Sequence, residues 1–267
     1  MTHLLRHDLN QPILDVSHVN FKFGDHVALD NITFHLHTGE RVAVVGPNGA
    51  GKSTLFKVIA GILRADSGDV NVFGSESGKH DCIAYIPQRS VVDWHFPVNV
   101  FDVVMMGRTA MLKPFAIPGK QHQAVVRQSL EKVGMQDLAS RQIGQLSGGQ
   151  QQRMFIARAL AQEAELMLMD EPLTGLDDPA QEDLLTLMEK LEQEEVTIMA
   201  ATHDLDQAAQ HFNRIFLLNR QLIRFGEAKD VLTAENLKIA YGGRLRLMED
   251  GKSMMALDHS CCEGGEE

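Results

Sequence analysis

The sequence predicts an α/β fold with a mostly parallel sheet, and three observations support this prediction. Short apolar runs have the length and composition of buried strands, at Val42–Val45, Ile83–Ile86, Leu166–Met169 and Val196–Ala200. Helical patterns lie between these runs after residue 40, and strands joined by such crossovers run parallel. A glycine-rich segment, residues 46–54, joins the first run to a helical pattern at residues 55–60.

The segment before this core favours an antiparallel β subdomain. Apolar and polar residues alternate in part over Ile13–Phe23 and more clearly over Ala28–Leu36, with Gly24-Asp25 as the turn between them. A turn at Ser67–Asp69 leads to a further short strand, expected at Val70–Phe73.

The segment between residues 98 and 146 has a helical pattern, interrupted at residues 113–120 and near Gly134. We therefore expect a helical subdomain of about residues 89–160, inserted into the α/β core and ending in a helix over Gln150–Gln162. Further along we expect a helix at Pro179–Glu195, a helix capped by Asp204, and a closing hairpin at residues 216–225. Residues 1–247 should thus form one domain, followed by an acidic, flexible tail at residues 248–267.

Composition limits the class of protein. The 267 residues include 25 Lys and Arg against 36 Asp and Glu, a net charge of −11, which argues against nucleic acid as a partner. No apolar run approaches the roughly 20 residues of a membrane span, and the N-terminus lacks a signal peptide. Three cysteines, Cys82, Cys261 and Cys262, form no disulfide framework, so we expect a cytoplasmic protein.

Residues 46–54 match the P-loop pattern G-x-x-x-x-G-K-[ST] at every fixed position. Its glycines allow consecutive N–H groups to form an anion nest at a helix N-terminus. Lys52 supplies a charge for the outer phosphates, and the Ser53 hydroxyl is a ligand for Mg²⁺. The predicted phosphate-binding residues are Gly46, Pro47, Asn48, Gly49, Ala50, Gly51, Lys52, Ser53 and Thr54.

Other polar residues also follow predicted strands, namely Gln88, Asp170-Glu171 and His203. Ligands of parallel sheets bind at the carboxyl ends of the strands, so these residues should meet at one sheet edge. Asp170 can hold Mg²⁺ through water, and Glu171 can orient or deprotonate an attacking water. The alternative is an acidic turn that is merely solvated.

The segment Leu146-Ser147-Gly148-Gly149-Gln150 opens a second helix with a hydroxyl and two glycines. These residues form a second phosphate-binding surface or, alternatively, a plain N-cap. Because one nucleotide hardly needs two helix N-termini from one chain, we expect two chains packed head-to-tail, each closing the P-loop of the other.

With these motifs in this order, the sequence resembles the ATP-binding cassette (ABC) family over roughly residues 13–240. The resemblance implies ATP and Mg²⁺ as cofactors, with Ser53, Gln88 and Asp170 as metal-binding residues. It implies that Gln88 senses the γ-phosphate and that His203 contacts it and holds Glu171 or the water.

The resemblance also assigns Asp177 to the dimer interface and Ser147, Gly148, Gly149 and Gln150 to the partner's nucleotide. Phe23 occupies the position of an aromatic that stacks on adenine. The family more often has tyrosine there, and the alternative is that Phe23 belongs to the core.

A finer resemblance, over Asp93–Val98 and Asp102–Arg108, is to the ATPase subunits of bacterial manganese, zinc or iron importers. Siderophore and haem importers have similar segments and remain an alternative. The resemblance implies a second copy of the chain, a membrane permease, and indirectly a metal-binding solute-binding protein. It places the chain on the cytoplasmic face of the inner (plasma) membrane.

Two further readings stay open. A soluble ABC ATPase acting on the ribosome or DNA is disfavoured by the acidic charge, and a small-molecule kinase or GTPase by residues 146–150. A docking surface for the permease is expected at Trp94, Phe96, Val98, Met105 and Met106, although about half of these residues should be core. In the tail, His259 and Cys261-Cys262 suggest a weak metal sensor, but a solubilising tail is the favoured interpretation.

Overall fold

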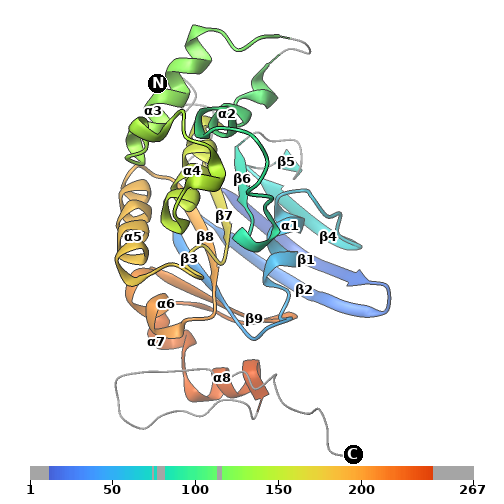
Figure 1. The fold of residues 1–267 in the computed structure, drawn as a ribbon. Coiled ribbons are helices and arrows are strands. Elements are labelled where there is room, and N and C mark those ends of the chain that lie inside the picture. Colours follow the sequence, from blue (N-terminus) through green and yellow to red (C-terminus); the bar gives the residue numbers. More distant parts are fainter. Residues whose placement is uncertain (1–11, 74, 77–81, 113–115, 243–267) are drawn as a thin grey trace, which may run out of the picture.

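The structure, a computed structural model, describes residues 12–73, 75–76, 82–112 and 116–242 (Figure 1). The expected tail with its Cys261-Cys262 pair lies outside the described residues. None of the described helices is long and apolar enough to cross a bilayer.

A six-stranded sheet forms the centre of the molecule, in the order β10-β9-β3-β8-β7-β6. Every neighbouring pair is parallel except β9 with β10, which confirms the predicted mostly parallel sheet and the closing hairpin. The strands are β3 (Arg41–Val45), β6 (Ile83–Ile86), β7 (Leu166–Asp170), β8 (Thr197–Thr202), β9 (Arg214–Asn219) and β10 (Gln221–Gly226).

The antiparallel β subdomain is a second sheet in the order β2-β1-β4-β5. Its strands are β1 (Leu14–Phe23), β2 (His26–Leu36), β4 (Ser67–Val72) and β5 (Ser75–Glu76). The turn predicted at Ser67–Asp69 is wrong, because these residues already pair with β1. At Gly68 a Cβ would lie 2.3 Å from the carbonyl oxygen of His18, so glycine permits this close pairing.

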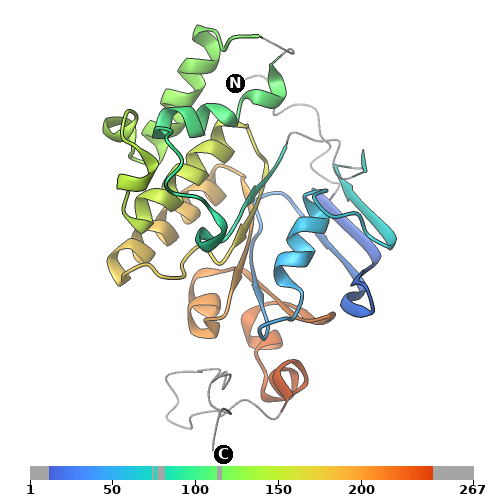
Figure 2. The same cartoon turned by 45° about the vertical axis from the view of Figure 1, so that its right-hand side comes forward.

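The helical subdomain covers one face of the central sheet, and helix α1 (Lys52–Ile59) with the β subdomain covers the other (Figures 1 and 2). A hydrophobic core lies on each face. Side chains alternate along β3, so that Val42 and Val44 face the first core while Ala43 and Val45 face the second core. The first core also takes in helix α1 and the strands of the β subdomain. Helix α1 is therefore packed between the two sheets.

The second core contains the helical subdomain and the helices beside it. These are α2 (Val100–Met106), α3 (Lys120–Lys132), α4 (Gly148–Ala161), α5 (Asp178–Gln193) and α6 (Leu205–His211). Part of the segment predicted to be helical between residues 98 and 146 forms short 3-10 turns instead, at Thr109–Met111, Gln136–Leu138 and Ile143–Gln145. Two short helices that the sequence analysis did not predict complete the described chain, α7 (Ala228–Val231) and α8 (Ala234–Tyr241).

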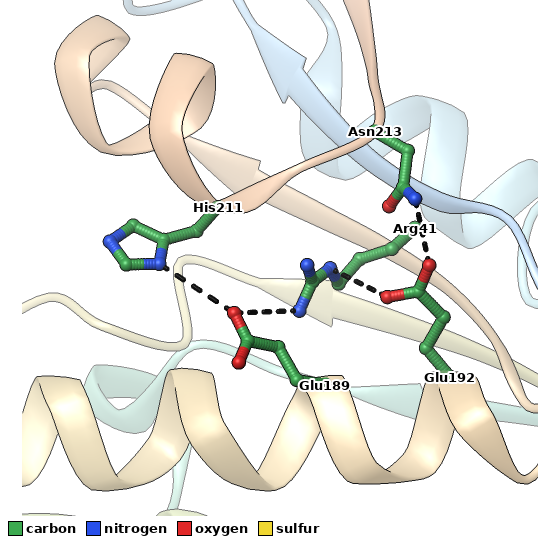
Figure 3. Close-up of polar contacts among 5 residues, drawn as sticks. All are labelled: Arg41, Glu189, Glu192, His211 and Asn213. Atoms are coloured by element: carbon green, nitrogen blue, oxygen red, sulfur yellow. Dashed lines mark hydrogen bonds and ion pairs between the residues drawn. The ribbon is translucent and has the colours of Figure 1, made fainter.

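A buried arginine joins the start of β3 to α5 at the edge of the sheet where β3 begins (Figure 3). Arg41 is only 8% exposed, and its Nε and Nη1 atoms lie 3.2 and 3.5 Å from carboxylate oxygens of Glu192 and Glu189. These are ion pairs without hydrogen-bond alignment. The Nδ2 of Asn213 donates to the second Glu192 oxygen at 2.8 Å, and His211 Nδ1 lies 3.9 Å from Glu189. The cluster thus holds three segments together: β3, α5 and the chain after α6.

We expect Arg41→Ala to lower the free energy of unfolding by about 2–3 kcal/mol, because it leaves two carboxylates facing each other without their cation. Denaturant unfolding measures this change. Asp183→Ala is the matched control, since it breaks an ion pair with Arg153 whose acid is two-thirds exposed and should cost less than about 0.5 kcal/mol. Equal losses in the two variants would show that the cluster does not hold α5.

Candidate functional site

The P-loop, residues 46–54, connects β3 to α1 as predicted. Two of its glycines are required because backbone from other segments lies very close to their Cα atoms. A Cβ at Gly46 would lie 2.0 Å from the carbonyl oxygen of Leu218. At Gly51, with φ of +99°, a Cβ would lie 2.4 Å from the carbonyl oxygen of Ala28. Neither position tolerates a side chain, so the path of the loop depends on glycine.

Lys52 is buried at the first position of α1, with its ammonium group turned back onto the loop. Nζ donates to the carbonyl oxygens of Gly46 at 2.7 Å and Pro47 at 3.1 Å. Burial lowers the pKa of Lys52, whereas the nearby carboxylates of Glu171 and Asp170 act to raise it. The lysine and the two acids therefore lie close enough to interact electrostatically, as the common sheet edge predicts.

Asp170 ends β7 and is only 6% exposed. The Tyr85 hydroxyl donates to Asp170 Oδ2 at 3.2 Å. Burial raises the pKa of Tyr85, and the Asp170 charge and this hydrogen bond raise it further. The tyrosine thus stays protonated and orients the Asp170 carboxylate. Because Asp170 is buried, the alternative of a merely solvated acidic turn is wrong for this residue.

Glu171 follows with a left-handed backbone, at a φ of 49°. This conformation is uncommon for a side chain other than glycine and directs Glu171 away from the strand. The Nε2 of Gln88 donates to Glu171 Oε2 at 2.9 Å, and the Thr174 hydroxyl donates to the same oxygen at 3.3 Å. The structure therefore brings Gln88 and Glu171 together from the ends of two neighbouring strands, β6 and β7.

Ser147 caps α4, as the N-cap alternative predicts. Its hydroxyl accepts from Gln150 N–H at 3.3 Å, and the Gln150 side chain accepts from Ser147 N–H at 3.0 Å. In this capping box the Ser147 hydroxyl already has a hydrogen-bond partner within its own chain, although the residue is exposed. The cap and a contact with a second chain are compatible, because the hydroxyl keeps a further acceptor site and its proton.

Three further predicted site residues, Phe23, His203 and Asp177, are exposed. Phe23 ends β1 with 54% of its surface accessible and an edge-on contact to Phe21, so the alternative of a core residue is wrong. His203 follows β8 directly. Asp177 caps α5 by accepting from Ala180 N–H at 3.1 Å.

The residues of the expected docking surface divide into two groups. Phe96 and Met106 are exposed, whereas Trp94, Val98 and Met105 are partly buried against the second core. The Trp94 ring meets Phe155 of α4 edge-on, with 5.8 Å between the centroids. The expectation that about half of the five belong to the core therefore agrees with the packing.

Three residues of the site, Thr174, Tyr85 and Tyr241, were missed by the sequence analysis. Tyr85 carried a signal, as a polar residue in an otherwise apolar strand. Tyr241, at the end of α8, carried none, because the fold alone brings it to the P-loop. Burial raises its pKa to about 12, while the Gly46 backbone beside its hydroxyl acts to lower it, without a well-formed hydrogen bond.

This arrangement, a P-loop with a buried lysine and two ordered acids at the end of β7, is typical of nucleotide hydrolysis. Residues 29–174 match the family model described as ABC transporter. The chain belongs to this family and is the ATP-hydrolysing component of a transporter.

Curated relatives cover most of the chain. It is 43% identical over 249 residues to a manganese transport system ATP-binding protein of Halalkalibacterium halodurans, covering 92% of this chain and 99% of the relative. It is 48% identical over 204 residues to a zinc transport system ATP-binding protein of Treponema pallidum, covering 76% and 77%. A chelated iron transport system protein of Yersinia pestis is 41% identical over 240 residues, covering 88% and 81%.

Two solved structures have the same fold. An inward-facing ABC transporter, proposed to be of the metal-chelate type, matches with a TM-score of 0.77 at 33% identity, covering 86% of this chain and 89% of that one. A dimeric ATP-binding cassette bound to ADP and phosphate matches with a TM-score of 0.68 at 26% identity, covering 80% and 98%.

We expect Gly51→Ala to lower the free energy of unfolding by at least about 2 kcal/mol and nucleotide affinity at least tenfold, because of the strained φ and the clash with Ala28. Denaturant unfolding and titration with a fluorescent ATP analogue measure the two effects. Gly119→Ala is the control, because φ there is negative and no atom lies within 4 Å of the added Cβ, so it should cost less than about 1 kcal/mol. Similar behaviour of the two variants would contradict the close-approach argument.

Proposed function

We propose that this chain hydrolyses ATP to drive a bacterial importer of metal ions, namely manganese, zinc or iron, through a separate permease. The observation that carries the catalytic part is the Glu171 carboxylate, held by Gln88 and Thr174 close to buried Lys52 and Asp170. The metal part is supported by the names of the manganese, zinc and iron relatives.

The donors at the site fit ATP with Mg²⁺. Asp170, Ser53 and Gln88 offer oxygen ligands, and Asp170 is buried and oriented by Tyr85. Among the described residues no three His, Cys, Asp or Glu side chains form a metal cluster, which suits an ion shared with phosphates. When bound, Mg²⁺ would neutralise charge on the phosphate oxygens.

The protein's own groups divide the remaining work. The P-loop amides and Lys52 bind and orient the phosphates, and Phe23 offers its exposed ring to adenine. Glu171 accepts a proton from the attacking water, with Gln88 and Thr174 fixing the carboxylate. His203, at the end of the neighbouring strand β8, orients the water or Glu171.

A head-to-tail dimer supplies the second phosphate-binding surface. Ser147 and Asp177 are both exposed, as an interface with the partner's nucleotide requires. The similar cassette that is dimeric with ADP and phosphate supports this assembly. Within each copy, residues 1–247 form the ATPase domain, and residues of about 89–160 form its helical subdomain.

The permease docks on the helical subdomain, at exposed Phe96 and Met106, which places the chain at the cytoplasmic face of the inner membrane. A metal-binding solute-binding protein would deliver the ion to that permease from outside. A siderophore or haem importer is the second candidate, favoured by the likeness to the metal-chelate type transporter.

We expect Glu171→Gln to retain ATP binding but to lose at least 10²-fold in the rate of hydrolysis, because an amide cannot accept the proton. ATP should then trap a dimer, seen by sedimentation, and adding Ser147→Arg should abolish that dimer without changing monomer affinity. Hydrolysis by Glu171→Gln within about tenfold of the parent would falsify the role of general base.

We expect Phe96→Asp with Met106→Asp to uncouple the chain from its permease while leaving basal ATPase activity unchanged. Copurification from detergent-solubilised host membranes and uptake of manganese, zinc, iron or a ferric chelate measure coupling and substrate. Ile62→Asp is the control, because Ile62 is equally exposed but lies next to α1. The docking proposal fails if the double variant transports as well as this control.

A further inference from the structure

Arg89 follows Gln88 directly and lies between two loops of the site. Its Nε donates to Oε1 of Gln151 at 3.0 Å, and its Nη1 donates to the carbonyl oxygen of Gly175 at 3.4 Å. Gln151 belongs to the first turn of α4, and Gly175 lies between Glu171 and Asp177. One guanidinium group therefore connects the start of α4 with the loop that leads to α5.

The guanidinium also packs directly on Gly148. A Cβ at Gly148 would lie 2.5 Å from Arg89 Nη1, so any side chain there would displace the arginine. Gln151 is buried, and its amide nitrogen donates to the Leu146 carbonyl oxygen at 3.3 Å. The partners of Arg89 are thus the groups that shape residues 146–151.

The backbone of Arg89 is tied to the same helix. Trp94 Nε1 donates to the Arg89 carbonyl oxygen at 3.1 Å, and the Trp94 ring packs on Phe155 of α4. Both the main chain and the side chain of Arg89 therefore depend on the position of α4.

We propose that Arg89 is a positioning residue that couples the Gln88–Glu171 contact in one nucleotide site to the surface that the same chain offers to its partner's site. Gln88 reaches Glu171, and the adjacent Arg89 reaches Gln151 and Gly175. A shift of Gln88 on nucleotide binding would move Arg89, and with it the phosphate-facing Gly148 and the interface loop at Asp177. This inference rests on the proposed function.

The simpler interpretation is that Arg89 only stabilises the helical subdomain. The two interpretations differ in which step they affect. A purely structural arginine would change the melting temperature and ATP binding to the monomer together with dimer formation. A positioning arginine would change dimer formation alone, because monomer binding uses the P-loop, which Arg89 does not contact.

The test uses full-length chain carrying Glu171→Gln, in which ATP-dependent dimerisation is measured by sedimentation and monomer affinity with a fluorescent ATP analogue. Arg89→Ala and Arg89→Met should each weaken the ATP-bound dimer about tenfold and change monomer affinity less than twofold. Arg89→Met retains the aliphatic stem and removes the donors, so it remains informative if alanine does not fold. Arg127→Ala, at an exposed arginine of α3, should leave the dimer unchanged.

A double-mutant cycle with Gln151→Ala identifies the partner. If Arg89 acts through Gln151, the effects on dimerisation should be less than additive. Failure of the Glu171→Gln parent to dimerise would contradict the proposed function itself. A dimer in the parent that Arg89→Met weakens less than twofold, or weakens only in proportion to lost monomer binding, would overturn the coupling role.

Discussion

The parallel register of β3, β8 and β7 is the constraint on which the rest of the site depends. Val45 pairs with Thr202 and Asp170 pairs with Ala201, so these strands end within about one residue of each other. The P-loop, Glu171 and His203 therefore all follow the carboxyl ends of these strands, at the same end of the sheet. Because each strand is buried on both faces, a slip in register would disturb the packing of its side chains against both cores, and the alignment of the chemical groups follows from hydrophobic packing.

The positive charge of Lys52 is compensated by groups of its own chain. Lys52 is buried among backbone carbonyls, and the attraction of Asp170 and Glu171 offsets part of the cost of desolvating its ammonium group. Phosphates would offer the same ammonium a stronger set of acceptors, and the carbonyl contacts hold it in reach of them. The backbone strain at Glu171 fits this picture, since strained residues persist where neighbouring contacts hold them.

Two arginines connect elements at opposite ends of the strands of the central sheet. Arg41 holds α5 and the end of α6 where β3 begins (Figure 3), and Arg89 connects the loops where β6 and β7 end. Arg41 is buried and forms ion pairs that lack hydrogen-bond alignment. Arg89 is partly buried and uses directional hydrogen bonds to a neutral amide and a carbonyl. Helix α5, whose N-cap is Asp177, is thus contacted by Arg41 towards its C-terminal end and preceded by the loop that Arg89 contacts.

The sequence by itself determined the α/β class, the positions of the strands in the central sheet, the P-loop, and the motifs at Gln88, residues 146–150, Asp170-Glu171 and His203. These features are local, since apolar period, glycine spacing and capping residues act within a few positions. The tertiary structure alone decided the start of β4, the exposure of Phe23, and the contacts that Tyr85, Arg89 and Tyr241 make. Each of these depends on contacts between segments distant in the chain, or on which side of a strand faces solvent. No local pattern encodes such contacts, because they arise only when the two sheets and α4 pack together.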